Sequence, residues 1–159
     1  MPLTLDGNGD ISGLVAGALP ANVIGAGAVL QVVSQQAPAN YTSTSSDLTL
    51  LTQSFTPTRS TSKILAIMSV VCERTGGGSS GNYIFISLKR DGTTIASNWA
   101  NALGYQLTTG ARGVGAHTYL DSPSTTSAIS YTLSGNFSSS GNVQWDMYSI
   151  QLTLLEIAA

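Results

Sequence analysis

Few side chains in this sequence could carry out acid–base or nucleophilic chemistry. The 159 residues contain one histidine, His117, and one cysteine, Cys72. A serine activated by His117 would need a turn that presents it, yet no G-x-S-x-G pattern is present. Cys72 ends an apolar run, a setting that favours a buried thiol over a reactive thiolate. We therefore expect a protein without catalytic residues, not an enzyme.

The acidic residues form no recognisable acid pair or metal site. Glycoside hydrolysis needs two carboxyl groups roughly 5–9 Å apart, whereas the acids here are scattered singly over expected turns and strand ends. The segment from Asp6 to Asp10 begins like a calcium loop, but Ile11 and Gly17 occupy the positions of the required Gly and Glu. The glycines of residues 76–81 lack the lysine of a phosphate-binding loop and precede an expected strand. The sequence predicts no metal and no cofactor.

The composition is typical of a β-rich protein with a neutral polar surface. Only 9% of the residues are charged, 42% are hydrophobic, and the net charge is −2. Because about a quarter of a typical globular domain is charged, the surface polarity must come from Ser, Thr, Asn and Gln. Apart from Lys89 and Arg90 the cations do not cluster, which excludes the electrostatic footprint of a nucleic-acid binder. The apolar residues 14–30 are interrupted by Pro20 and by glycines, so we expect neither a signal peptide nor a membrane-inserted helix.

Short apolar runs separated by turn signals predict an all-β domain. The expected strands cover residues 29–34, 48–55, 64–72, 83–90, 93–99, 114–120, 128–134 and 143–157, with a short strand near 105–108. Asp91-Gly92 predicts a two-residue hairpin, and a change of parity in the last run predicts a bulge near Tyr148 and Ser149. Residues 64–72 are apolar on both faces, which indicates the centre of a sandwich or contact with a neighbouring subunit. These signals favour an antiparallel, jelly-roll-like β-sandwich.

The first part of the chain has a different amino-acid composition from the rest. Residues 1–27 are rich in Gly and Ala and contain no Lys, Arg or aromatic residue. Such a segment has too few large side chains to bury itself. We expect an extended N-terminal arm over residues 1–27, which gains structure by contact with another copy or another protein, and a head domain over residues 28–159.

A neutral surface of aromatic rings and amides would suit sugars. The candidate receptor-contact residues are Trp99, Tyr105 and Tyr119, with nearby amides as hydrogen-bonding partners. Packing in the core is the alternative account of each ring.

Several segments resemble the tail-fibre and virion structural proteins of tailed bacteriophages. They are the opening Met1-Pro-Leu-Thr-Leu-Asp-Gly-Asn-Gly-Asp-Ile-Ser-Gly-Leu14, Ala18-Leu-Pro-Ala21, the turn Pro57-Thr-Arg-Ser-Thr-Ser-Lys-Ile-Leu65, the hairpin Leu88-Lys-Arg-Asp-Gly-Thr-Thr-Ile95, the block 119–128 and the ending Leu152-Thr-Leu-Leu-Glu-Ile-Ala158. They follow the order expected of that family and cover most of the chain.

The resemblance implies a virion protein that forms a homotrimer. Its N-terminal arm would anchor to a tail, baseplate or capsid protein, and its β-domain would contact a glycan of the host surface. The apolar residues of the arm that we assign to anchoring are Leu3, Leu5, Ile11, Leu14 and Leu19. The family has no shared catalytic motif, and the long shaft of many fibres is missing here.

Three functions follow, in order of preference. The first is a short, non-enzymatic homotrimeric tail fibre, made in the host cytoplasm and located in the virion. The second is a decoration or head-fibre protein of the capsid. The third is a carbohydrate-binding module or polysaccharide-degrading enzyme.

Overall fold

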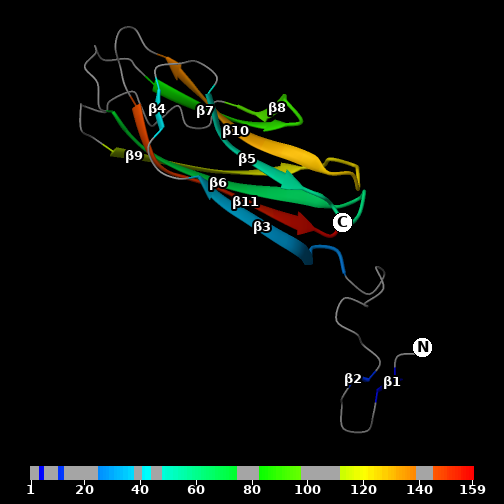
Figure 1. Ribbon diagram of the computed structural model, residues 1–159. Coiled ribbons are helices and arrows are strands. Elements are labelled where there is room, and N and C mark those ends of the chain that lie inside the picture. The colour runs from blue at the N-terminus through cyan, green and yellow to red at the C-terminus, as the bar shows by residue number, and fades with distance from the viewer. Residues whose placement is uncertain are drawn as a thin grey trace.

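The structure is a computed structural model, and it describes residues 4–5, 11–12, 25–37, 41–43, 48–74, 83–97, 112–138 and 145–159 (Figure 1). All regular secondary structure in these residues is β-strand. The strands are β1 (Thr4–Leu5), β2 (Ile11–Ser12), β3 (Val29–Ala37), β4 (Tyr41–Ser43), β5 (Leu48–Phe55), β6 (Lys63–Arg74), β7 (Tyr83–Arg90), β8 (Thr93–Ala96), β9 (Arg112–Asp121), β10 (Ile129–Ser138) and β11 (Trp145–Ile157). The described part of the chain contains no helix with the length and hydropathy that a bilayer crossing requires.

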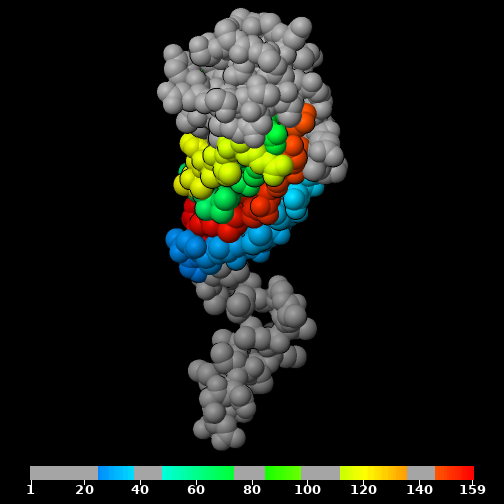
Figure 2. All heavy atoms as spheres, turned by 90° about the vertical axis from the view of Figure 1, so that its left-hand side faces the viewer, coloured from blue at the N-terminus to red at the C-terminus, as the bar shows by residue number. Residues whose placement is uncertain are grey.

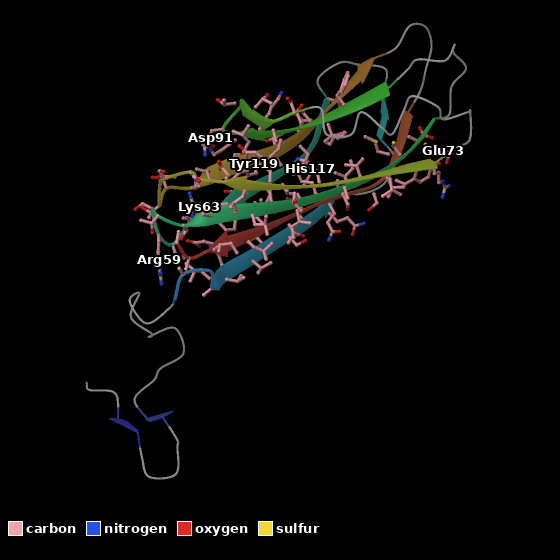
Figure 3. The ribbon with its side chains drawn as sticks, turned by 180° about the vertical axis from the view of Figure 1, so that it is seen from behind. Arg59, Lys63, Glu73, Asp91, His117 and Tyr119 are labelled. Carbon is pink, nitrogen blue, oxygen red and sulfur yellow. The ribbon has the colours of Figure 1, made fainter. Side chains whose placement is uncertain are left out.

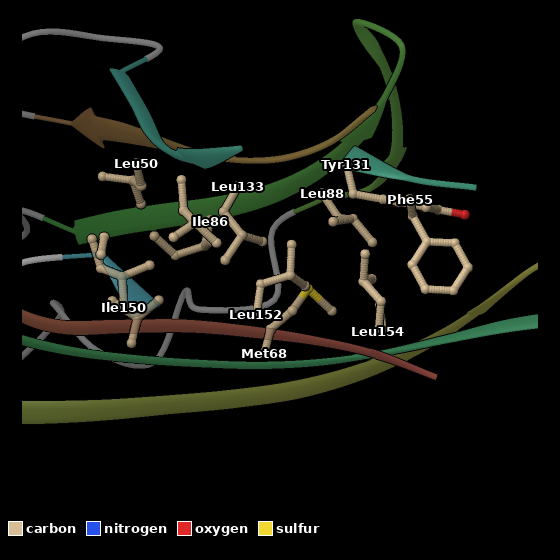
Figure 4. Packing of buried hydrophobic residues seen from close by; sticks show 14 of the residues in the cluster. Leu50, Phe55, Met68, Ile86, Leu88, Tyr131, Leu133, Ile150, Leu152 and Leu154 are labelled. Atoms are coloured by element: carbon tan, nitrogen blue, oxygen red, sulfur yellow. The ribbon is translucent and has the colours of Figure 1, made fainter. Parts of the chain in front are cut away.

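Two antiparallel sheets form the sandwich. One has the order β5-β10-β7-β8, and the other has the order β3-β11-β6-β9 with β4 paired to the start of β11. We call them the first and the second sheet. The side chains between them meet in a common core (Figure 4). The predicted fold class, an antiparallel jelly-roll-like β-sandwich, is confirmed.

Most strands lie where the alternation of apolar residues places them. The strands expected over 48–55 and 83–90 have these bounds in the structure, and β6, β9 and β10 extend beyond the predicted runs. The strand expected over 93–99 ends at Ala96. The short strand expected near 105–108 lies outside the described residues. No sequence signal was assigned to β4, which pairs with β11 through Trp145–Met147.

The predicted hairpin and bulge are both confirmed. Asp91 and Gly92 have positive φ angles of 47° and 81°, as the tight turn between β7 and β8 requires. In β11 the register against β6 shifts between Met147 and Ser149, so Tyr148 is the additional residue. Because of this shift, Met147 and Ile150 both face the core although three positions separate them.

The core contains mainly aliphatic side chains from both sheets. Leu88, Leu133 and Tyr131 come from the first sheet, and Met68 and Leu152 come from the second (Figure 4). On β6 the buried residues alternate from Ile64 to Cys72, as expected for a strand with one face on a core. Burial raises the pKa of the Cys72 thiol to about 12, so this thiol is part of the core and not a nucleophile.

Candidate binding surfaces

The structure describes one of the three predicted receptor-contact residues. Trp99 and Tyr105 lie outside the described residues. Tyr119 lies on β9, on the same face as His117, and this face points into the sandwich (Figure 3). Its side chain is partly buried and packs against the core, which reduces the ring area available for stacking on a sugar. The receptor role of these three residues therefore stays a prediction.

The predicted anchoring residues are described only in part. Leu3, Leu14 and Leu19 lie outside the described residues. For Leu5 and Ile11 the structure gives the backbone, in which β1 and β2 pair antiparallel with these two residues opposite each other. The anchoring role of the arm also stays a prediction.

One buried carboxylate ties the two sheets together. Asp121, at the end of β9, is 6% exposed and accepts hydrogen bonds from Arg90 Nη1 at 2.8 Å and from the Tyr131 hydroxyl at 2.7 Å. Arg90 and Tyr131 belong to β7 and β10 of the first sheet, whereas Asp121 belongs to the second. Burial and the hydrogen bond to Asp121 raise the pKa of Tyr131, which therefore stays a neutral donor. The cluster closes one end of the sandwich.

A second buried carboxylate holds the turn between β5 and β6. The Glu156 carboxylate accepts hydrogen bonds from Thr58 N at 2.8 Å, Arg59 N at 3.1 Å and Gln31 Nε2 at 2.7 Å. Burial raises the pKa of Glu156, but its neighbours, Thr58 and Gln31 among them, outweigh burial and the net pKa is lowered. Ser62 Oγ contributes to this lowering, although it makes no well-aligned hydrogen bond with any described residue.

Both carboxylates have a structural role. The oxygens of each accept hydrogen bonds from donors of the chain itself, so neither carboxylate is placed to accept a proton from a substrate. Neither hydrogen-bond network was identified from the sequence. In the described residues, no group of three or more His, Cys, Asp or Glu side chains could hold a metal ion.

Two neighbouring rows on the outer face of the first sheet are polar. Across its four strands Thr52, Thr132, Lys89 and Thr94 stand in one row, and Thr52 Oγ1 lies 3.1 Å from Thr132 Oγ1. The neighbouring row places Ser54 opposite Ser130. Hydroxyls in these positions satisfy one another and water, as on a solvent-facing sheet.

The outer face of the second sheet is different in character. It carries all five exposed large hydrophobic side chains of the described residues, and the register puts them on the side that points away from the core. They are Val29, Val32, Ile67, Val114 and Leu120. Figure 2 shows atoms of β9, β6, β11 and β3 side by side on one uncovered surface. We call this surface the apolar face.

Sequence reasoning identified only part of the apolar face. The two-sided apolar pattern of residues 64–72 indicated that β6 has a second apolar side, and this side includes Leu65, Ile67 and Val71. The contributions of β3 and β9 were missed because each strand places only two large apolar residues on this side. The signal becomes visible when the four strands are aligned in register.

Comparison with solved structures finds the same fold in proteins of a virus particle. The crystal structure of the T13 particle of infectious bursal disease virus (IBDV) matches with a TM-score of 0.58 and 18% identity, over 78% of this chain and 30% of that chain. The VP2 subviral particle of the same virus matches with a TM-score of 0.57 and 18% identity, over 78% of this chain and 32% of that chain. The T=1 particles derived from this virus match with a TM-score of 0.56 and 18% identity, over 78% of this chain and 31% of that chain.

The likeness is one of fold. The chain spans about a third of the length of these viral proteins. Neither a scan against protein-family models nor a search of curated protein sequences finds a match. The resemblance to tail-fibre proteins therefore stays a prediction.

Proposed function

We propose that this protein is a non-enzymatic structural component of a virus particle, and that it decorates the capsid as a head-fibre or decoration protein. The observation that carries the proposal is the sandwich fold, which the chain shares over 78% of its length with proteins from IBDV particles. The saturated buried carboxylates agree with a structural role.

The finer parts of the proposal come from the sequence. Residues 1–27 anchor the protein to another virion protein, and the sandwich forms a homotrimer. The opening segment and the hairpin motif resemble bacteriophage virion proteins, which makes a tailed phage the proposed source of the particle. The same resemblance favours a second candidate, a short tail fibre whose sandwich contacts a host glycan.

The position of the protein in the particle separates the two candidates. Particles should be labelled through gold-conjugated antibodies against the sandwich and imaged by electron microscopy. Label distributed over the capsid supports the decoration protein, whereas label confined to the tail supports the short fibre. Purified particles that lack the protein would contradict both.

Incubation of the purified protein with host polysaccharide tests the non-enzymatic assignment. We expect no release of oligosaccharides. Turnover that His117→Ala abolishes would contradict the assignment.

A further inference from the structure

The apolar face has a continuous apolar row at one end. Leu155 on β11 lies opposite Val32 on β3 and opposite Leu65 on β6, and Leu65 lies opposite Leu120 on β9. The row therefore crosses all four strands of the second sheet. Val32 and Leu120, on the two edge strands, are 57% and 55% exposed. Exposed, contiguous apolar rows of this kind mark interaction surfaces.

The rest of the face is uncharged. Between Leu65 and Val71 of β6, the opposed residues on β3, β11 and β9 are aliphatic, Ser, Thr or Gln. The charged groups stand at the two ends of β6, with Lys63 at one end and, at the other, Glu73 bonded to Arg112 and opposite Asp146 of β11 (Figure 3). A partner with a charged surface, such as nucleic acid, would find no counter-charges here. The face suits another uncharged, flat apolar surface.

The apolar row of the second sheet has no counterpart in the comparable row of the first sheet. On the outer face of the first sheet, the comparable row is Thr52, Thr132, Lys89 and Thr94. Both sheets have four principal strands and the same core. Solvent exposure alone would favour hydroxyls on both outer faces, so the second sheet has a face adapted to burial.

The dimensions of the face fit three copies around one axis. Four strands about 4.8 Å apart make a sheet roughly 19 Å wide. Three such sheets arranged as the sides of a triangular prism would each lie ~5.5 Å from the axis, which is about half of the ~10 Å that separates packed sheets. Side chains would therefore fill the centre. Over ~30 Å of strand each copy would cover about 600 Å², which approaches the ~800 Å² per partner of standard interfaces.

The edge strands also fit this arrangement. Neighbouring strands are antiparallel throughout the sheet, so β3 and β9 run in opposite directions. At each corner of the prism, β9 of one copy would meet β3 of the next in antiparallel orientation. The exposed Leu120 on β9 is level with the exposed Val32 on β3, so these two side chains would meet at the corner, and two sheet edges would be covered.

We propose that the apolar face is the contact surface between copies of this chain, with three copies packed through it around an axis that follows the strands. This inference rests on the homotrimer of the proposed function and adds the surface that forms it. The bound partner is a second and third copy of the same chain.

The test introduces charge at both edges of the face. Val32→Glu with Leu120→Glu places two carboxylates in the apolar row, at positions already exposed enough to tolerate them in a folded monomer. By light scattering, the wild-type protein should have three times the chain mass of 16.4 kDa. The double variant should have the mass of one chain, with an unchanged β-sheet circular dichroism spectrum.

A matched control carries the same charges on the other sheet. Thr52→Glu with Thr94→Glu changes exposed positions on its edge strands β5 and β8, in one row across that sheet. This variant should stay trimeric. A wild-type monomer or dimer would overturn the inference, and so would a double variant of the apolar face that stays trimeric. Particle labelling tests the virion role, and light scattering tests this interface. Because the two measurements are independent, failure of one proposal can be told apart from failure of the other.

Discussion

At the scale of single residues, the buried carboxylates explain how a weakly charged chain closes its sandwich. Glu156 replaces water as the acceptor for the backbone of the β5–β6 turn, and Asp121 joins the two sheets through Arg90 and Tyr131. A buried carboxylate is stable only when its oxygens are filled by donors. Both networks depend on pairings between residues far apart in the sequence, so spacing alone could not predict them.

Replacing Glu156 by Gln should destabilise the protein by about 3 kcal/mol. The Gln oxygen would still accept from Thr58 N and Arg59 N, but the NH₂ would face the donor Gln31 Nε2, and the remaining hydrogen bonds would lose the strength that the charge gives them. The free energy of unfolding in urea measures the effect. Glu73→Gln is the control, because Glu73 pairs with Arg112 at the surface and should change stability far less. Equal effects of the two substitutions would contradict the role given to Glu156.

The stability contribution of Glu156 should disappear in acid. Burial raises the pKa of Glu156, but its hydrogen bonds lower this pKa by more than burial raises it. The folded state therefore binds the proton less readily than the unfolded state. The contribution is then complete above the unfolded pKa of about 4.3 and is lost as the pH falls through the lower folded value. Urea unfolding of the wild type and of Glu156→Gln at a series of pH values measures it. The difference between the two proteins should shrink at acidic pH, and a constant difference would refute the assignment.

At the scale of the elements, the bulge in β11 decides which side chains reach the core. Upstream of Tyr148 the strand buries Met147, and downstream it buries Ile150, Leu152 and Leu154. If Tyr148 were paired regularly instead of bulged, one of these two groups would face the wrong side of the sheet. The bulge therefore lets one long strand serve the core along its whole length.

Deletion of Tyr148 should change the free energy of unfolding by less than about 1 kcal/mol, because it joins Met147 directly to Ser149 and the regular alternation that results still turns Met147 and Ile150 towards the core. Urea unfolding measures the change. Tyr148→Ala is the matched control, since it keeps the bulge and removes only the ring that lies 4.2 Å from the Arg112 guanidinium. The control should lose less than about 1 kcal/mol. A deletion that costs about 3 kcal/mol, as expected when a core side chain such as Met147 is lost, would contradict the assignment of Tyr148 as the additional residue.

Strand positions, the hairpin and the bulge were predictable because they depend on local periodicity and turn chemistry. The apolar runs around Leu50 and Ile86 and the Asp91-Gly92 pair are read directly from neighbouring residues. The pairing of β4 with β11 was not predictable, since three residues give no period. The apolar face was visible only through β6, because its remaining members come together through the register of four distant strands.

At the scale of the whole molecule, the arm and the sandwich should separate cleanly. The first described backbone hydrogen bonds to the sandwich are those of Gly27 N to Ala158 O and of Ala158 N to Ala28 O. Removal of residues 1–24 preserves them, so the truncated protein should keep its thermal unfolding midpoint and its β-sheet spectrum. If the arm anchors the protein, the truncated form should be missing from purified particles. Incorporation at the wild-type level would contradict the anchoring role.

The charge distribution of the whole molecule makes the proposed trimer a hydrophobic assembly. Lys63 and the Glu73–Arg112 pair stand at the ends of the apolar face, and the rows between them carry no charge. Attraction between exposed charges is largely screened beyond ~10 Å at about 0.1 M salt, whereas burial of apolar surface persists and is strengthened by sulfate. A dilution series followed by light scattering should therefore show trimers that dissociate at the same protein concentration in low and in high sodium chloride, and at a lower concentration in sodium sulfate. Dissociation promoted by sodium chloride would mean that charged groups at the ends, and not the apolar rows, hold the copies together.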